Sequence, residues 1–342
     1  MPNNSTKILF LMTLISGVLI SLCANSWMGA WMGLEINMLS FIPLLSSNKN
    51  MFSTEASLKY FLIQAIASST LLFTILMKTS IIEMFYLYKN SPWNNFMMIP
   101  LLMKMACAPF HWWLPSVMEG LSWMNCFIIL SIQKIAPMML ISYLLTNNIF
   151  IQMMIISTAI IGAVGGLNQI SLRKILAYSS INHIGWMIMT TIMGINLWWM
   201  YFIIYMINIM MVITMTTMMN VSYISQTFNS MNQKKTIKFT MFISMLSLGG
   251  LPPFIGFFPK WIIIYFMAQN LMITTSMILI MTSLLTLYYY LRVMYTTLMI
   301  SNSETIWTTM FYPKYIYSKL VMFSLSLIIL GMSTSTLFMF LY

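Results

Sequence analysis

Long apolar runs separated by short polar loops dominate this 342-residue sequence. A transmembrane helix needs about 20 consecutive apolar residues, whereas a β-barrel strand alternates apolar and polar positions over about 10 residues. The runs have the length of helices and lack such alternation. We therefore predict an all-α polytopic membrane protein with eleven spans, at residues 8–24, 27–45, 57–77, 96–114, 122–145, 149–169, 175–195, 197–219, 239–267, 270–294 and 319–341.

Two of these spans contain prolines and glycines next to a lysine. MKMACAPFHWWLP places Lys104 before Pro109 and Pro115, and LSLGGLPPFIGFFPKW places Lys260 after a run of glycines and prolines. Hydrocarbon cannot satisfy the carbonyls that such breaks leave open, so the breaks must be buried in protein or line a wet cavity. Matching breaks in two halves are typical of inverted-repeat transporters. We expect a single transmembrane domain, 1–342, with inverted repeats at 1–145 and 149–294 and an added C-terminal helix at 319–341.

Composition supports the membrane class and excludes others. Hydrophobic residues make up 60% of the chain and charged residues only 6%, against about 25% charged in soluble domains. The net charge of +11 comes from basic residues spread over many loops, so we expect no nucleic acid partner. The sequence has no glycine-rich phosphate motif and no cysteine cluster for iron and sulfur. We expect the chain to bind no cofactor and to do no redox chemistry itself.

The basic residues also predict the orientation of the chain. With eleven spans, eleven of the sixteen lysines and arginines fall in loops on the side of the N-terminus, two fall opposite, and three lie inside spans. Loops rich in lysine and arginine stay on the cytoplasmic or matrix side, so we place the N-terminus there and the C-terminus opposite. No arginine-rich presequence precedes Ile8, and we expect Met1 to begin the mature protein.

Charged side chains inside the spans are the first candidates for function. A charge at mid-membrane depth costs about 2.5 to 3.5 kcal/mol on insertion scales, so it rarely lies there without a partner or a task. Glu35 lies in the second span, and Lys134 lies near the centre of the fifth, where Pro137 predicts a break just after it. We expect Lys104 and Lys134 on neighbouring antiparallel helices. The alternatives are a lysine that reaches the headgroups and a protonated Glu35 that hydrogen-bonds between helices.

The seventh span carries a polar group around a histidine. Ser179, Ser180, Asn182 and His183 lie within about one and a half helical turns. A lone histidine is more often a packing residue, but one among hydroxyls and an amide inside a membrane helix is a candidate proton relay. The chain has only two histidines, His111 and His183, and no aspartate, so we expect no metal site.

Three segments resemble the signature segments of the antiporter-like membrane subunits of respiratory complex I, a family similar to subunits of multi-subunit cation/proton antiporters. They are KMACAPFHWWLPSVMEG, RKILAYSSINHIGW and LSLGGLPPFIGFFPKW, and SIQKIAPMM resembles one member in particular. The resemblance implies a core membrane-arm subunit that couples NADH oxidation and ubiquinone reduction to proton pumping. It also implies the mitochondrial inner membrane, with the N-terminus in the matrix and the C-terminus in the intermembrane space.

The same resemblance implies the partners of the chain. These would be other membrane-arm subunits of the complex, including further antiporter-like chains, together with membrane lipids and protons. NAD, FMN, iron–sulfur clusters and ubiquinone would be bound by other subunits. The 41 methionines are more than packing requires, and they indicate mitochondrial encoding, in which AUA is read as Met.

The resemblance further implies roles for four charged residues in proton translocation. Glu35 matches the family glutamate that pairs with the lysine of the first broken helix, here Lys104. Lys134 matches the central connecting lysine, and Lys260 matches the lysine of the second broken helix, nearer the exit side. The chain departs from the family pattern at Ile129, where the family has a histidine. We therefore assign the central role to Lys134 alone.

The resemblance assigns less definite roles to further residues of this chain. His183, His111, Ser179 and Asn182 are possible relay residues, and Glu119 matches a family position without an assigned role. Two other functions stay open, a stand-alone cation/proton antiporter and a structural membrane scaffold whose lysines do not pump. A hard cation needs several oxygen ligands, and the spans offer few carboxylates for one.

Overall fold

The computed structural model describes residues 5–46, 50–84, 91–145, 147–231 and 235–299. These residues form fourteen α-helices and no β-strand, with one isolated β-bridge between Ser171 and Tyr223. Within the same residues, seven helical stretches are long and apolar enough to cross a membrane. The predicted all-α membrane class is confirmed. The helix predicted at 319–341 lies outside the described residues.

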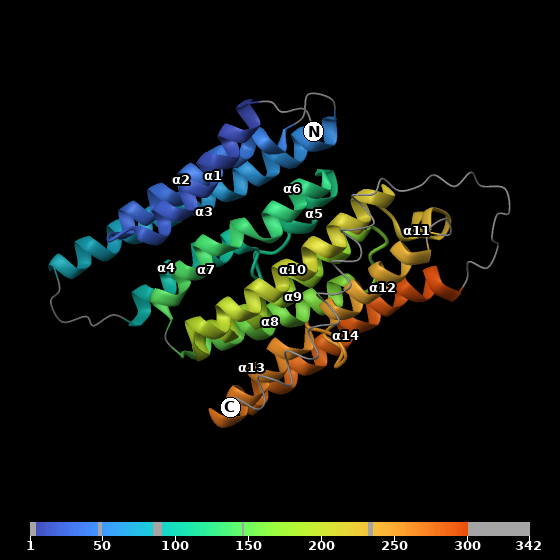
Figure 1. The fold of residues 1–342 in the computed structure, drawn as a ribbon. Helices are drawn as coiled ribbons and strands as arrows, with labels where there is room; N and C mark the ends of the chain where they lie inside the picture. Colours follow the sequence, from blue (N-terminus) through green and yellow to red (C-terminus); the bar gives the residue numbers. More distant parts are fainter. Residues whose placement is uncertain (1–4, 47–49, 85–90, 146, 232–234, 300–342) are drawn as a thin grey trace. The chain divides into compact units, whose positions relative to one another are not determined.

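The chain divides into two compact units, Met1–Thr158 and Ala159–Tyr342, with the boundary inside α8 (Ile149–Gly166). In the first unit, α2 lies between α1 and α3, and α7 contacts α1, α2, α4 and α6 (Figure 1). Helix α7 therefore lies at the centre of this unit. The helices of the first unit are α1 (Ser5–Cys23), α2 (Trp27–Leu45), α3 (Met51–Met84), α4 (Ser91–Met105), α5 (Trp113–Gly120), α6 (Trp123–Leu130) and α7 (Ile132–Leu144).

In the second unit, α9 is the most buried helix and contacts α10, α13 and α14 (Figure 1). Helix α10 also packs against α12 and α13, and α12 packs against α14. A membrane helix that is covered on all sides can carry polar side chains toward its neighbours without exposing them to lipid. The helices of this unit are α9 (Leu172–Met193), α10 (Ile195–Met219), α11 (Ile224–Met231), α12 (Lys235–Gly249), α13 (Phe257–Gln269) and α14 (Ile273–Met299).

Both predicted broken spans are pairs of short helices. The span at 96–114 is α4 followed by a turn and the start of α5, and the span at 239–267 is α12 followed by a turn and α13. Pro109 lies in the first turn, as expected. Pro115 does not break a helix, because it is the third residue of α5, where backbone N–H groups have no acceptor within the helix.

The predicted break after Lys134 is wrong in its position. Pro137 lies inside α7, and the interruption is at Ser131, where φ is −118° and ψ is −84°. The carbonyl to which Pro137 cannot donate is that of Gln133, four residues earlier in the first turn of α7. The interruption at Ser131 lies before this turn and before Lys134, and it separates α6 from α7.

Candidate functional site

Lys104 lies in the last turn of α4, immediately before the first break. Ala106 adopts a left-handed conformation with φ of 63°, and the N–H of Cys107 donates to the carbonyl of Leu102 at 3.0 Å. This bond across five residues is the pattern of a helix C-terminus that closes on a left-handed residue. It satisfies one of the four carbonyls that a helix end leaves without an intrahelical donor.

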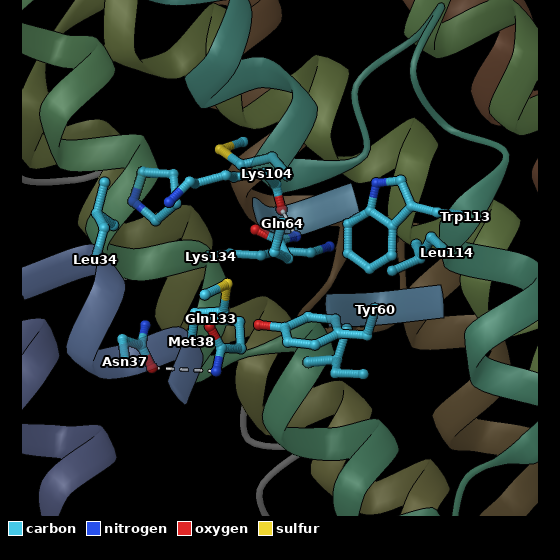
Figure 2. A pocket seen from close by; sticks show the side chains of 13 residues that line it. Leu34, Asn37, Met38, Tyr60, Gln64, Lys104, Trp113, Leu114, Gln133 and Lys134 are labelled. Atoms are coloured by element: carbon cyan, nitrogen blue, oxygen red, sulfur yellow. Dashed lines mark hydrogen bonds between the residues drawn. The ribbon is translucent and has the colours of Figure 1, made fainter. Parts of the chain in front are cut away.

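Two side chains from other helices reach the next carbonyls of α4. The indole N–H of Trp113 in α5 donates to the carbonyl of Met103 at 3.1 Å. The amide of Gln64 in α3 donates to the carbonyl of Lys104 at 3.3 Å (Figure 2). Since lipid offers no donors, buried side chains must complete the end of a helix that stops inside a membrane protein.

Lys104 and Lys134 line the same cavity in the first unit, 7% and 2% exposed, respectively. The cavity volume of about 20 Å³ is sufficient for a water molecule, which needs roughly 10–15 Å³. Figure 2 shows the two lysines with the other polar side chains around this space. The remaining polar lining residues are Asn37, Tyr60, Gln64 and Gln133.

Two lining residues connect the cavity wall across helices. Gln133, next to Lys134 in α7, donates its amide to Asn37 Oδ1 in α2 at 3.1 Å (Figure 2). Ile129 also lines the cavity and adds an apolar side chain to its wall. The protein residues that offer polar atoms to water here are therefore carboxamides, a tyrosine and the two lysines.

Glu35 lies near Lys104 without forming an ion pair with it. The carboxylate is close enough to interact electrostatically with Lys104. Within the described part of the chain, however, no ion pair joins the two, and Glu35 Oε2 is buried without a hydrogen-bond partner. An unpartnered buried carboxylate oxygen is energetically costly.

The second break closes in the same way as the first. Helix α12 ends at Gly249, and Gly250 has φ of 81°. The N–H of Leu251 donates to the carbonyl of Leu246 at 3.3 Å, again across five residues. The two helices that stop beside a lysine thus share one type of C-terminal closure.

Lys260 completes this second helix end with its own ammonium group. Its Nζ donates to the carbonyl of Gly249 at 2.9 Å and lies 3.5 Å from that of Leu248. The ammonium also lies 5.9 Å from the centre of the Trp186 ring in α9, within the range of a cation–π contact. Lys260 is therefore a buried lysine that neighbouring backbone and an aromatic ring hold in place.

His183 lies in a polar cluster between α9 and α10. Its Nδ1 is 2.7 Å from the hydroxyl of Tyr201, and its ring lies 4.9 Å from that of Tyr205, centre to centre. A small cavity of about 10 Å³ adjoins these three residues and also touches Asn208 and Ser247, among others. Two residues next to Lys260 line the same cavity. They are Leu248, whose carbonyl faces the Lys260 ammonium, and Pro259, which precedes Lys260 in the chain.

The other relay candidates lie apart from these cavities. Ser179 donates to the carbonyl of Leu176 in its own helix, and Asn182 donates to the carbonyl of Thr282 in α14 at 3.4 Å. His111 lies in the turn after α4, with Nδ1 3.2 Å from the carbonyl of Pro109. Glu119 is exposed. In each of these three contacts, of Ser179, Asn182 and His111, the partner of the side chain is a backbone carbonyl.

The sequence prediction missed several polar residues of the two cavities. Gln64 is a lone carboxamide in an otherwise apolar stretch of α3. Polar side chains inside membrane spans are candidates for function, and this rule, which selected Glu35, could also have selected Gln64. Tyr60, Tyr201 and Tyr205 carried no such signal, because tyrosine is common in membrane helices near the interfaces. Among the described residues, no group of three or more metal-ligating side chains is present.

Comparison with known proteins places this geometry in a family. Residues 24–286 match the family described as NADH:quinone oxidoreductase/Mrp antiporter, TM. The chain is 44% identical over 309 residues to NADH-ubiquinone oxidoreductase chain 2 of Locusta migratoria, a match that covers 90% of each chain. It is 46% identical over 310 residues to the protein of that name from Anopheles gambiae, over 87% of this chain and 88% of the other.

Solved structures share the fold. A chain of respiratory complex I from Thermus thermophilus, solved with bound aureothin, matches with a TM-score of 0.80 at 20% identity, over 97% of this chain and 79% of the other. A chain of the Mrp complex from Dietzia sp. matches with a TM-score of 0.69 at 18% identity, over 84% of this chain and 59% of the other. Together with the relatives of known sequence, these matches mean that the chain belongs to the family of NADH:quinone oxidoreductase and Mrp antiporter transmembrane subunits.

Proposed function

We infer that the chain is a core membrane-arm subunit of respiratory complex I, the NADH:ubiquinone oxidoreductase, and forms an antiporter-like proton-translocating unit in the mitochondrial inner membrane. Its family membership and its animal relatives named chain 2 of that enzyme support this inference. In this proposal NAD, FMN, iron–sulfur clusters and ubiquinone are bound by other subunits. Energy released by their redox chemistry drives protons through this chain.

The observation that carries the proposal is the cavity lined by Lys104 and Lys134. In a low-dielectric site, a proton on one lysine raises the free energy needed to charge the next. Water in the cavity offers a route by which a proton passes between them. Movement of Lys104 toward or away from Glu35 changes that balance, so the pair acts as a switch and Lys134 as the next carrier.

The second unit would hold the onward part of the path. Lys260 is the proposed carrier there, and His183 with the Tyr201 hydroxyl is the proposed relay beside it, because both adjoin the cavity that touches the backbone around Lys260. His111, Ser179 and Asn182 stay candidate relay positions outside this minimal path.

We further propose the complete architecture of eleven transmembrane helices, with inverted repeats at 1–145 and 149–294. Support comes from the two breaks, each of which closes on a left-handed residue beside a lysine. The distribution of basic residues supports a matrix-side N-terminus and a C-terminus in the intermembrane space. Other antiporter-like subunits and lipids would then surround the chain in the membrane arm.

The test is to substitute the lysines in the assembled complex. In Lys104→Met and Lys134→Met variants we expect the complex to assemble and proton translocation coupled to NADH oxidation to fall by about tenfold or more. Coupled pumping would be followed with a pH-sensitive dye in sealed vesicles. Unchanged pumping in both variants would contradict the proposal. Impaired assembly with normal pumping per assembled complex would favour a structural scaffold, and sodium or potassium flux through the purified chain would favour an antiporter.

A further inference from the structure

The two broken helices differ in the group that completes them. In each helix, the carbonyl two residues before the left-handed residue needs a donor from outside the helix. In α12 this is the carbonyl of Leu248, which faces the ammonium of Lys260 at 3.5 Å. In α4 it is the carbonyl of Lys104 itself, and the donor is the amide of Gln64 at 3.3 Å.

The position of each lysine relative to its break explains the difference. Side chains on a helix lean toward the N-terminus of that helix. Lys104 lies in the last turn of α4, so it leans back along α4 and away from the carbonyls at the break. Lys260 lies in the first turn of α13, so it leans toward the carbonyls that α12 leaves open. The first break therefore needs a donor from a third helix, and α3 provides it.

Gln64 is placed to affect the chemistry of Lys104 without taking part in it. Its side chain is buried, 5% exposed, and it lines the cavity that both lysines share. Figure 2 shows its amide beside the Lys104 backbone, while the Lys104 side chain runs the other way, toward Leu34 of α2. The contact thus holds the backbone from which the Lys104 side chain extends.

We propose that Gln64 is a positioning residue for proton transfer at Lys104. By holding the carbonyl of Lys104 at the break, the carboxamide sets where the ammonium lies relative to Glu35 and Lys134. This inference rests on the proposed function, since it assigns a residue to the same proton path. Gln64 itself carries no proton in this scheme.

The experiment replaces Gln64 in the assembled complex and measures the rate of proton translocation coupled to NADH oxidation, per assembled complex. Gln64→Met keeps the size of the side chain but removes the donor, and Gln64→Asn keeps the amide but shortens its reach. For both we expect an assembled complex in which coupled proton translocation slows about threefold to tenfold, the effect of losing one buried hydrogen bond that orients a reacting group. Gln152→Met is the control, because the Gln152 amide bonds exposed Asn147 in the first unit, and we expect no change.

A structural role and a positioning role give different results. If Gln64 only packs, the amount of complex falls while the rate of coupled proton translocation per assembled complex stays at the parent value, and this result overturns the inference. Failure of both variants to assemble overturns it as well. Lys104→Met is measured in parallel. If that variant pumps normally, the proposed function fails, whereas a defect in Lys104→Met with normal Gln64 variants overturns the positioning role alone.

Discussion

At the end of α4 the side-chain donors to the last carbonyls come from α3 and α5, whereas at the end of α12 they come from the ammonium of Lys260 in α13. Both ends close on a left-handed residue with a hydrogen bond across five residues. The difference lies in whether the lysine precedes or follows the break. A lysine before the break is not needed to complete its helix, while a lysine after the break is.

This comparison separates the structural role from the chemical role of two lysines whose sequence surroundings are similar. Lys104 is available to Glu35 and to the cavity with Lys134, because Gln64 and Trp113 do the capping. Lys260 combines a proposed proton-carrying part with a structural one. Substitutions at the two positions should therefore have different effects on assembly, even where both stop proton transfer.

The largest expected effect is the loss of Lys260. Lys260→Met leaves two buried carbonyls, of Leu248 and Gly249, without their donor, at about 1–3 kcal/mol for each unsatisfied group. We expect much less assembled complex and a lower inactivation temperature, in addition to lost pumping. Blue native gels and thermal inactivation of NADH:ubiquinone activity would measure this. Lys104→Met is the matched variant and should assemble normally; equal assembly defects in the two variants would break the comparison.

A smaller effect is expected from a methyl group at the second break. Gly250→Ala puts an alanine at φ of 81° and a Cβ 3.0 Å from both Cδ and Nζ of Lys260. The left-handed conformation alone costs about 1–2 kcal/mol for a residue with a side chain, and the Cβ pushes the ammonium from its carbonyls. We expect reduced thermal stability of the complex and slower pumping.

The control for that change is another glycine of the second unit. A Cβ at Gly194 would meet nothing within 4 Å, and its φ of 161° is extended. Gly194→Ala should therefore change thermal stability much less than Gly250→Ala. If the two alanine variants were equally stable, the close approach of Lys260 to Gly250 would have no energetic role.

The relay beside Lys260 predicts a moderate effect without loss of assembly. Tyr201→Phe removes the hydroxyl that lies 2.7 Å from His183 Nδ1 but keeps the aromatic ring. A hydrogen bond of this kind contributes about 0.5–1.5 kcal/mol, so we expect coupled proton translocation to slow about threefold. Tyr265→Phe, at an exposed ring of α13, is the control. Normal pumping by Tyr201→Phe would exclude this hydroxyl from the path.

The smallest effect is expected at the first break. Ala106 has φ of 63°, so Ala106→Gly relieves the left-handed strain but increases the freedom of the unfolded chain and removes a buried methyl group. These terms oppose each other, and we expect the inactivation temperature of the complex to change by less than the equivalent of about 1 kcal/mol. A loss as large as that of Gly250→Ala would show that the two closures are not alike.

The sequence predicted the parts of the fold that depend on composition along one helix. The second predicted span, 27–45, has the same bounds as α2, and the two proline and glycine breaks lie where predicted. Insertion into hydrocarbon requires a run of apolar side chains, and a missing backbone donor disturbs a helix locally. Both causes act on neighbouring residues, so they can be recognised in the linear sequence.

Contacts between helices required the tertiary structure. Gln64 meets the carbonyl of a residue 40 positions later, and the Tyr201 hydroxyl meets a ring 18 positions earlier. The sequence also indicated a break after Lys134, whereas the structure has it at Ser131, before the lysine. The pattern of apolar and polar residues along one helix does not indicate which side chain of another helix will meet which backbone carbonyl.

By itself, the sequence determined that the chain is a helical membrane protein with buried lysines beside broken helices, because burial of charge and loss of backbone donors follow from residue type and order. Only the tertiary structure decided which groups complete those breaks. The leaning of side chains toward a helix N-terminus turns Lys260 toward its break and Lys104 away from it. A packing neighbour, Gln64, then provides the donor that Lys104 does not.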